Sequence, residues 1–160
     1  MRMIDPNAFR ADRTDHLVLE MSALYLDHNK LTSLPPNMLD LVDDIINKVD
    51  FSHNMISQIS GKVFFQPSIQ IKNMIADIDL SFNLLKSVPT QMMVNAVRNL
   101  QTLNLEGNQI SLIRNNAFAR ARVAYEWSYL ENLNVAGNFI TKIEPKAFHG
   151  RAAALLNLNL

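Results

Sequence analysis

The sequence contains no cysteine among its 160 residues. Disulfide bonds, thiolate nucleophiles and cysteine-based zinc sites are therefore excluded in this chain. No asparagine is followed two positions later by serine or threonine, so an N-glycosylation site is also lacking. No apolar run approaches the roughly 20 residues that a membrane-spanning helix needs. We expect no direct membrane insertion in this segment.

An excess of charge of one sign is missing as well, because 15 Lys and Arg residues balance 15 Asp and Glu residues. Nucleic-acid binding relies on clustered Lys and Arg, so a nucleic-acid partner is not expected. The sequence has no Gly-rich phosphate loop and no nucleophile elbow. We therefore expect neither an enzyme nor a cofactor. The apolar fraction of 48% is sufficient for one domain with a substantial core.

An internal repeat dominates what is present. Five segments share the pattern apolar-x-x-apolar-x-apolar-x-x-Asn-x-apolar, and a sixth begins at Leu155. Their alternation of apolar and polar residues is typical of a short strand, whose side chains point alternately inward and outward. A single repeat cannot bury its own apolar side, so stability is expected to come from stacking. The five segments are 21–31, 46–56, 75–85, 100–110 and 130–140.

The repeats alternate in length, because successive repeat asparagines are 25, 29, 25 and 30 residues apart. The additional residues follow an apolar position ten residues beyond each asparagine, on the side opposite the strands. We predict one or two helical turns in 36–44 and 90–97, and a longer helix in 119–129. The predicted fold class is α/β: a right-handed β/α solenoid with a parallel concave sheet, and with short helices and loops on its convex side.

The repeat resembles the typical class of leucine-rich repeats, found in Slit, in chaoptin-like adhesion proteins and in Toll-like receptor ectodomains. Ile143-x-x-x-Ala147-Phe148 and Leu34-Pro35 carry this resemblance together with the repeated pattern, which covers nearly the whole chain. It implies a horseshoe that binds a protein ligand on its concave face, in cell adhesion or receptor recognition, outside the cell or at its surface. An intracellular, cytoplasmic scaffold and a substrate-recognition domain of a larger enzyme are the alternatives.

We interpret residues 1–160 as a single solenoid. About five full repeats run from Met21 to Leu155, with partial repeats at both ends. Solenoids normally carry polar capping repeats, and the pattern shows none here. A fragment of a longer array is therefore expected, as is self-association through the uncapped ends.

Two sets of candidate residues follow from the repeat. The repeat asparagine turns the chain off each strand, and its amide is expected to satisfy backbone groups buried between neighbouring repeats. This asparagine ladder comprises Asn29, Asn54, Asn83, Asn108 and Asn138. Outward positions on the concave strands escape the core requirement, so they carry the specificity of that face. The candidate protein-binding residues are Tyr25, Asp27, Lys48, Asp50, Asp77, Asp79, Asn104, Glu106 and Asn134.

Ser52 and Ser81 are expected to point outward with Asp27 and Glu106, because they share one repeat position. The outward residues of successive strands are largely acidic or polar and include one aromatic residue, which is typical of a protein-binding face. The alternative is that they are solvated strand positions without a contact role.

His28 and His53 also share a repeat position, and together with Asp27 and Asp50 they could hold a divalent metal ion. We favour a surface turn instead, because Phe82 occupies the same position in the next repeat. No metal is therefore expected. For the aromatic cluster in 119–129, we favour filling of space under the convex insertion over an exposed interaction surface. This cluster comprises Tyr125, Trp127 and Tyr129.

Overall fold

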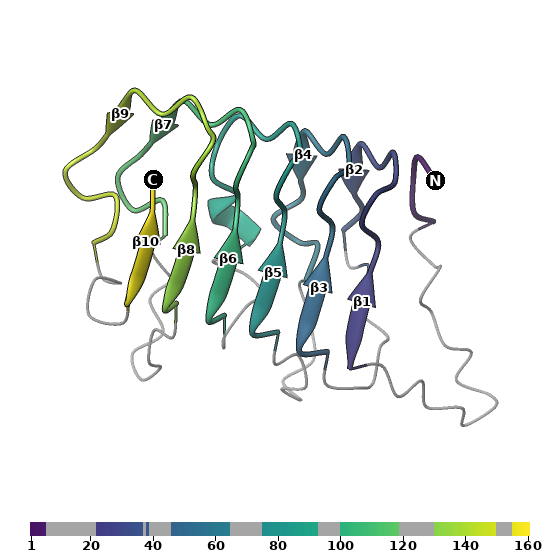
Figure 1. The fold of residues 1–160 in the computed structure, drawn as a ribbon. Helices are drawn as coiled ribbons and strands as arrows, with labels where there is room; N and C mark the ends of the chain where they lie inside the picture. The colour runs from purple at the N-terminus through teal and green to yellow at the C-terminus, as the bar shows by residue number, and fades with distance from the viewer. Residues whose placement is uncertain are drawn as a thin grey trace.

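The computed structural model describes residues 1–5, 22–36, 38, 46–64, 75–92, 100–118, 130–149 and 155–160. Its main feature is a six-stranded parallel sheet in which each strand comes from a different repeat (Figure 1). The strands lie in the order β1-β3-β5-β6-β8-β10, so their order in space follows the sequence. They are β1 (Ala23–Tyr25), β3 (Lys48–Asp50), β5 (Asp77–Asp79), β6 (Thr102–Asn104), β8 (Asn132–Asn134) and β10 (Asn157–Asn159). This arrangement confirms the predicted solenoid.

Equivalent residues of successive repeats are paired directly across the sheet. Leu24 pairs with Val49, Val49 with Ile78, and Ile78 with Leu103. Leu103 in turn pairs with Leu133, and all five side chains are buried. Because alternate strand residues point to opposite sides, the flanking residues of each strand face outward. The predicted register of the repeats is confirmed.

The core continues behind the sheet as further rows of repeat residues. One row follows the strands directly, and another follows the repeat asparagines. Each coil covers the apolar side chains of its neighbour, as expected for a solenoid in which single repeats have no core of their own. The first row contains Phe51, Leu80, Leu105 and Val135, and the second contains Leu31, Ile56, Leu85 and Ile110.

Two short parallel sheets lie on another side of the coils. In one, β2 (Ser33–Leu34) pairs with β4 (Gln58–Ile59). In the other, β7 (Leu112–Ile113) pairs with β9 (Lys142–Ile143). The sequence pattern marks an apolar residue at each of these places but does not predict the strands. Two residues are too few to show an alternation of apolar and polar side chains.

Helix is sparse among the described residues, where only residues 90–92 are helical. The Thr90 hydroxyl donates a hydrogen bond to the carbonyl of Ala117 at 3.0 Å and so links two coils. Nearby, the rings of Phe118 and Phe148 stack with their centroids 5.4 Å apart. The helix predicted in 119–129, with its aromatic cluster, lies outside the described residues, as do most of 36–44 and all of 93–97.

Residues 1–5 pack against the first coil. The backbone N–H groups of Lys30 and Thr32 donate to the carbonyls of Met1 and Arg2 at 2.9 and 3.3 Å. Ile4 is buried in the core. No helix in the described part of the chain is long and apolar enough to cross a membrane.

Candidate protein-binding face

The outward residues of the six-stranded sheet form two columns, which we call the concave face. The register places Tyr25 beside Asp50, Asp50 beside Asp79, and Asp79 beside Asn104. Lys48 lies beside Asp77 in the second column. Members of the concave face are Ala23, Tyr25, Lys48, Asp50, Asp77, Asp79, Thr102, Asn104, Asn132, Asn134, Asn157 and Asn159.

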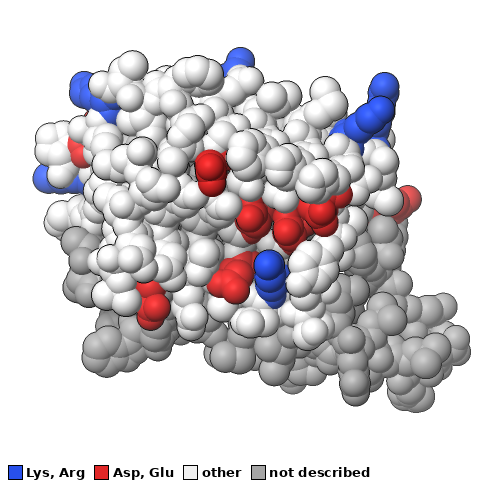
Figure 2. Space-filling view, in the orientation of Figure 1, with Lys and Arg blue, Asp and Glu red and all other residues white. Residues whose placement is uncertain are grey.

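The N-terminal half of the concave face is acidic. Asp50, Asp77 and Asp79 lie on two neighbouring strands, and Figure 2 shows carboxylates gathered in this part of the surface. The Lys48 ammonium lies 5.6 Å from the centroid of the Tyr25 ring, at the border of the cluster. Tyr25 is 59% exposed, so its ring is accessible. This half therefore combines negative charge with an exposed aromatic surface.

The carboxylates of β3 and β5 also have a structural role that the sequence analysis did not identify. Asp50 Oδ1 accepts a hydrogen bond from the backbone N–H of Ser52 at 2.9 Å. Asp79 Oδ1 accepts one from Ser81 at 2.8 Å. Each is an Asx turn, in which a side chain satisfies the backbone two residues later. The signal was present in the sequence, because Asp and Asn at the end of each strand are the residues that form such turns.

The predicted outward orientation of Ser52 and Ser81 is wrong. Their exposed fractions are only 7% and 4%. The strands end at Asp50 and Asp79, and the Asx turns bend the chain beyond them, so the strict alternation of the strand does not extend to the two serines. Asp27 and Glu106, at the same repeat position, remain half-buried. The third outward column predicted from the sequence is therefore incomplete.

Asn104 and Asn134 form the same turn on β6 and β8. Their Oδ1 atoms accept from the backbone N–H groups of Glu106 and Ala136 at 3.2 and 3.1 Å. This bond fixes the orientation of each amide, because only the oxygen can accept. The Nδ2 atoms consequently point away from the turn. Asn104 Nδ2 donates to Asp79 Oδ2 at 3.1 Å, and Asn134 Nδ2 donates to Glu106 Oε2 at 2.9 Å.

A surface hollow of about 710 Å³ lies over the concave face. Its lining comes from β3, β5, β6, β8 and β10 and from Leu156. Enclosed small-molecule sites are lined mainly by apolar and aromatic side chains, whereas this hollow is open to solvent and combines carboxylates and amides with apolar residues such as Leu156 and Leu158. Its extent across five strands suits a polypeptide better than a compact ligand.

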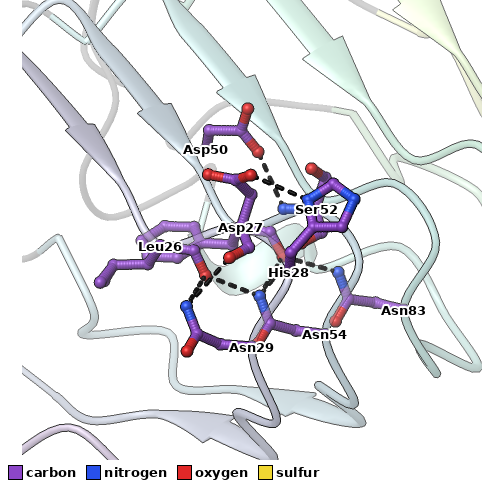
Figure 3. Close-up of polar contacts among 9 residues, drawn as sticks. Leu26, Asp27, His28, Asn29, Asp50, Ser52, Asn54 and Asn83 are labelled. Carbon is purple, nitrogen blue, oxygen red and sulfur yellow. Dashed lines mark hydrogen bonds and ion pairs between the residues drawn. The ribbon is translucent and has the colours of Figure 1, made fainter. Parts of the chain in front are cut away.

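The asparagine ladder lies at the bend after each strand (Figure 3). Asn83 Oδ1 accepts from the backbone N–H of Ile56 in the preceding coil at 2.9 Å. Its Nδ2 donates to the carbonyl of Phe51 in that coil and to two carbonyls of its own coil. Asn54 and Asn108 make the equivalent bonds, and all three amides are buried. Asn29 and Asn138, nearer the ends of the array, are half-buried.

The position before each ladder asparagine has a left-handed backbone. His28, His53 and Phe82 all have φ of 52°, while Gly107 and Gly137 have φ of 63° and 64°. The three rings stack with centroid distances of 4.3 and 4.6 Å. The stacked rings of His28, His53 and Phe82 therefore belong to the turns that follow the strands. No group of three or more His, Cys, Asp or Glu residues suited to a metal ion occurs among the described residues.

Asp27 is the one carboxylate of the candidate set with a clear electrostatic partner. Its Oδ2 lies 2.9 Å from Nδ1 of His28 (Figure 3). The hydrogen bond from His28 lowers the pKa of Asp27 below its ordinary value of 3.8. Asp27 is thus ionised over the whole physiological range and adds to the negative charge beside Asp50.

Comparison with known proteins supports the same interpretation of the repeats. The Leucine Rich Repeat family model matches residues 99–120. Lumican of Bos taurus is 30% identical over 128 residues, which cover 79% of this chain and 34% of lumican. Tsukushi of Gallus gallus is 30% identical over 140 residues, covering 88% of this chain and 34% of Tsukushi. Fibromodulin of Gallus gallus is 28% identical over 130 residues, covering 80% of this chain and 31% of fibromodulin.

The chain thus spans about a third of the length of the curated relatives it matches. These relatives are extracellular small leucine-rich proteoglycans, which supports the extracellular assignment over the cytoplasmic alternative. The parallel sheet, the asparagine ladder and the family-model match all indicate leucine-rich repeats. The chain therefore belongs to the leucine-rich repeat proteins, with repeats of the extracellular type, and its location is extracellular or at the cell surface.

Proposed function

We propose that the concave face binds a protein ligand, in cell adhesion or receptor recognition, and that the chain has no catalytic role. The observation that carries the proposal is the hollow over five strands, in whose lining polar side chains that the core does not require lie beside apolar ones. Protein interfaces contain exposed aromatic anchors within a polar surround, and Tyr25 beside Lys48 and Asp50 has this composition.

The experiment compares concave and convex variants against a panel of purified extracellular proteins. The concave variant is Tyr25→Ala/Asp50→Asn/Asp79→Asn, in which the asparagines keep the Asx turns. The convex control is Lys62→Ala/Lys146→Ala, in the turns that follow β4 and β9. Surface plasmon resonance measures the dissociation constant of each panel member.

We expect a panel member that binds the wild type and the convex control equally, and binds the concave variant at least about tenfold more weakly. That loss corresponds to about 1.4 kcal/mol, within the range for one interface anchor. Circular dichroism should show unchanged thermal midpoints for both variants. Binding that is lost only in the convex control would overturn the proposal.

A further inference from the structure

The concave face changes hydrogen-bonding character along one column. Asp50, Asp79, Asn104 and Asn134 each use Oδ1 to accept the backbone N–H two residues later. The remaining atom of each side chain faces the surface. On β3 and β5 this atom is a carboxylate oxygen, which accepts; on β6 and β8 it is an amide nitrogen, which donates.

The Asx turns make this polarity a fixed property of the fold. An asparagine amide in solution can rotate by 180° and exchange its donor and acceptor. Here a rotated Asn104 or Asn134 would direct its NH₂ group at a backbone N–H, which cannot accept. The surface therefore presents carboxylate acceptors on β3 and β5. The amide nitrogens on β6 and β8 each donate one hydrogen, to Asp79 or Glu106, and keep a second one for a ligand.

Two neighbouring residues act on the charge of the acidic end in opposite directions. Asp77 adds a further carboxylate on β5, whereas the Lys48 ammonium over the exposed Tyr25 ring offsets one negative charge, so the end stays acidic. The second column on β8 and β10 is neutral, with Asn157 Nδ2 donating to Asn132 Oδ1 at 2.6 Å. The charge of the two columns is thus confined to β3 and β5, where Figure 2 shows carboxylates gathered, while the half-buried Glu106 adds a carboxylate beside Asn134.

We propose that the ligand is a polypeptide segment that lies across the strands with Lys or Arg side chains over β3 and β5. Over β6 and β8 the segment presents neutral acceptors, such as Gln side chains or backbone carbonyls. Charge complementarity at the acidic end and hydrogen bonding at the amide end set its orientation. This inference rests on the proposed function, because it assigns the chemistry of the concave ligand.

The distance along the face fits a short segment. Neighbouring coils of a parallel sheet are about 4.8 Å apart, so three steps from β3 to β8 span about 14 Å. An extended chain covers this distance with about four or five residues, at about 3.3 Å per residue. A seven-residue peptide is therefore long enough to test both ends at once.

The probe is the synthetic peptide Ac-KAKAQAQ-NH₂, with Ac-EAEAQAQ-NH₂ as the charge-reversed control. Binding to the 15N-labelled chain is followed by NMR. The amide resonances of Ser52 and Ser81 report on the aspartates, and those of Glu106 and Ala136 report on the asparagines. We expect the lysine peptide to perturb Ser52 and Ser81 most strongly and the glutamate peptide to bind more weakly.

Two variants complete the experiment. Asp50→Asn/Asp79→Asn should raise the dissociation constant of the lysine peptide by roughly three- to tenfold, the range for two exposed ion pairs. Asp79→Asn/Asn104→Asp exchanges two neighbours that hydrogen-bond at 3.1 Å, with the net charge unchanged. Both residues can still form Asx turns, and the exchange should move the strongest lysine-dependent perturbation from Ser81 to Glu106.

Equal binding of the two peptides, or a perturbation that does not move in the exchange variant, would overturn the inference. Absence of binding by the lysine peptide at millimolar concentration would overturn it as well. The proposed function has its own readout, the loss of panel binding in the concave variant. The two failures are therefore distinguishable.

Discussion

At the scale of single residues, Asp and Asn side chains make many of the hydrogen bonds that hold the backbone at the strand ends. The ladder amides join neighbouring coils, while the Asx residues on the concave face satisfy the backbone just beyond each strand. Both uses follow from a short side chain that carries an oxygen acceptor near its own backbone. The difference is direction, because the ladder points inward and the Asx residues point outward.

Replacing Asn83 should be among the most destabilising polar substitutions in the chain. Asn83→Ala leaves the buried Ile56 N–H without its acceptor and removes three bonds to carbonyls, which keep their other donors. At about 1–3 kcal/mol for the unsatisfied N–H and about 1 kcal/mol for each lost bond, a loss of about 3 kcal/mol or more is expected in urea unfolding. Asn29→Ala is the matched control, and because Asn29 is half-buried it should cost only about 1 kcal/mol. Equal losses would contradict the ladder's role.

The lowered pKa of Asp27 predicts a specific response to its neighbour. His28→Ala removes the hydrogen bond that lowers this pKa, so the value should rise toward 3.8 in a carboxyl NMR titration. His53→Ala is the control, since His53 contributes least and the pKa should stay nearly unchanged. Because the folded pKa lies below the unfolded one, the pair's stabilisation is present above pH 3.8 and is lost as the pH falls through the lowered value. An equal change in the Asp27 pKa in both variants would rule out His28 as the main cause of the lowered value.

At the scale of the strands and turns, the left-handed position before each ladder asparagine separates two kinds of coil. The first three coils place a ring there, and the next two place a glycine. The last ring, Phe82, leans over Gly107. A Cβ atom on Gly107 would lie 2.6 Å from the Phe82 ring, whereas a Cβ on Gly137 would meet its nearest atom at 3.4 Å.

Two alanine substitutions test this difference. Gly137→Ala should cost about 1 kcal/mol, from the left-handed backbone alone. Gly107→Ala should cost more, because the Phe82 ring must also move. In a Phe82→Ala background the two substitutions should lower the free energy of unfolding by the same amount, as measured by chemical unfolding. The ring contact would be disproved if the Gly107 variant were no less stable than the Gly137 variant in the original background.

Much of the fold could be predicted from the sequence, because the repeat imposes one register on every coil. Leu103 and Leu133 pair as the alignment of their repeats predicts. The concave candidates were placed by the same alignment. The turn beyond each strand could not be predicted in this way. Ser52 and Ser81, which are buried, lie in turns that local bonds to Asp50 and Asp79 form beyond the strands, and periodicity contains no information about such bonds.

At the scale of the whole molecule, polar and apolar surfaces occupy different places. The concave face is polar, whereas the end of the stack beyond β8 exposes apolar side chains. Leu156 is 75% exposed, and Leu158, Leu160 and Phe139 are also exposed. Leu158 and Leu160 have the repeat positions of the buried Leu133 and Val135, which a neighbouring coil covers.

We predict that the 160-residue chain associates with itself through this apolar end. Multi-angle light scattering at increasing concentration should show a rising mean mass, because burial of Leu156 and Leu160 removes apolar surface from water. Leu156→Lys/Leu160→Lys should restore the monomer mass of 18.2 kDa. A wild-type chain that stays monomeric at high concentration would contradict the prediction.

Hydroxyl-radical footprinting determines whether the concave face is the binding face. The wild-type chain is oxidised alone and in complex with a protein from the extracellular panel, and mass spectrometry measures the oxidation of each side chain. Binding through the concave face predicts that oxidation of Tyr25, which is exposed there, falls in the complex, while oxidation of the exposed convex His149 does not. Protection of His149 with Tyr25 unchanged would contradict it.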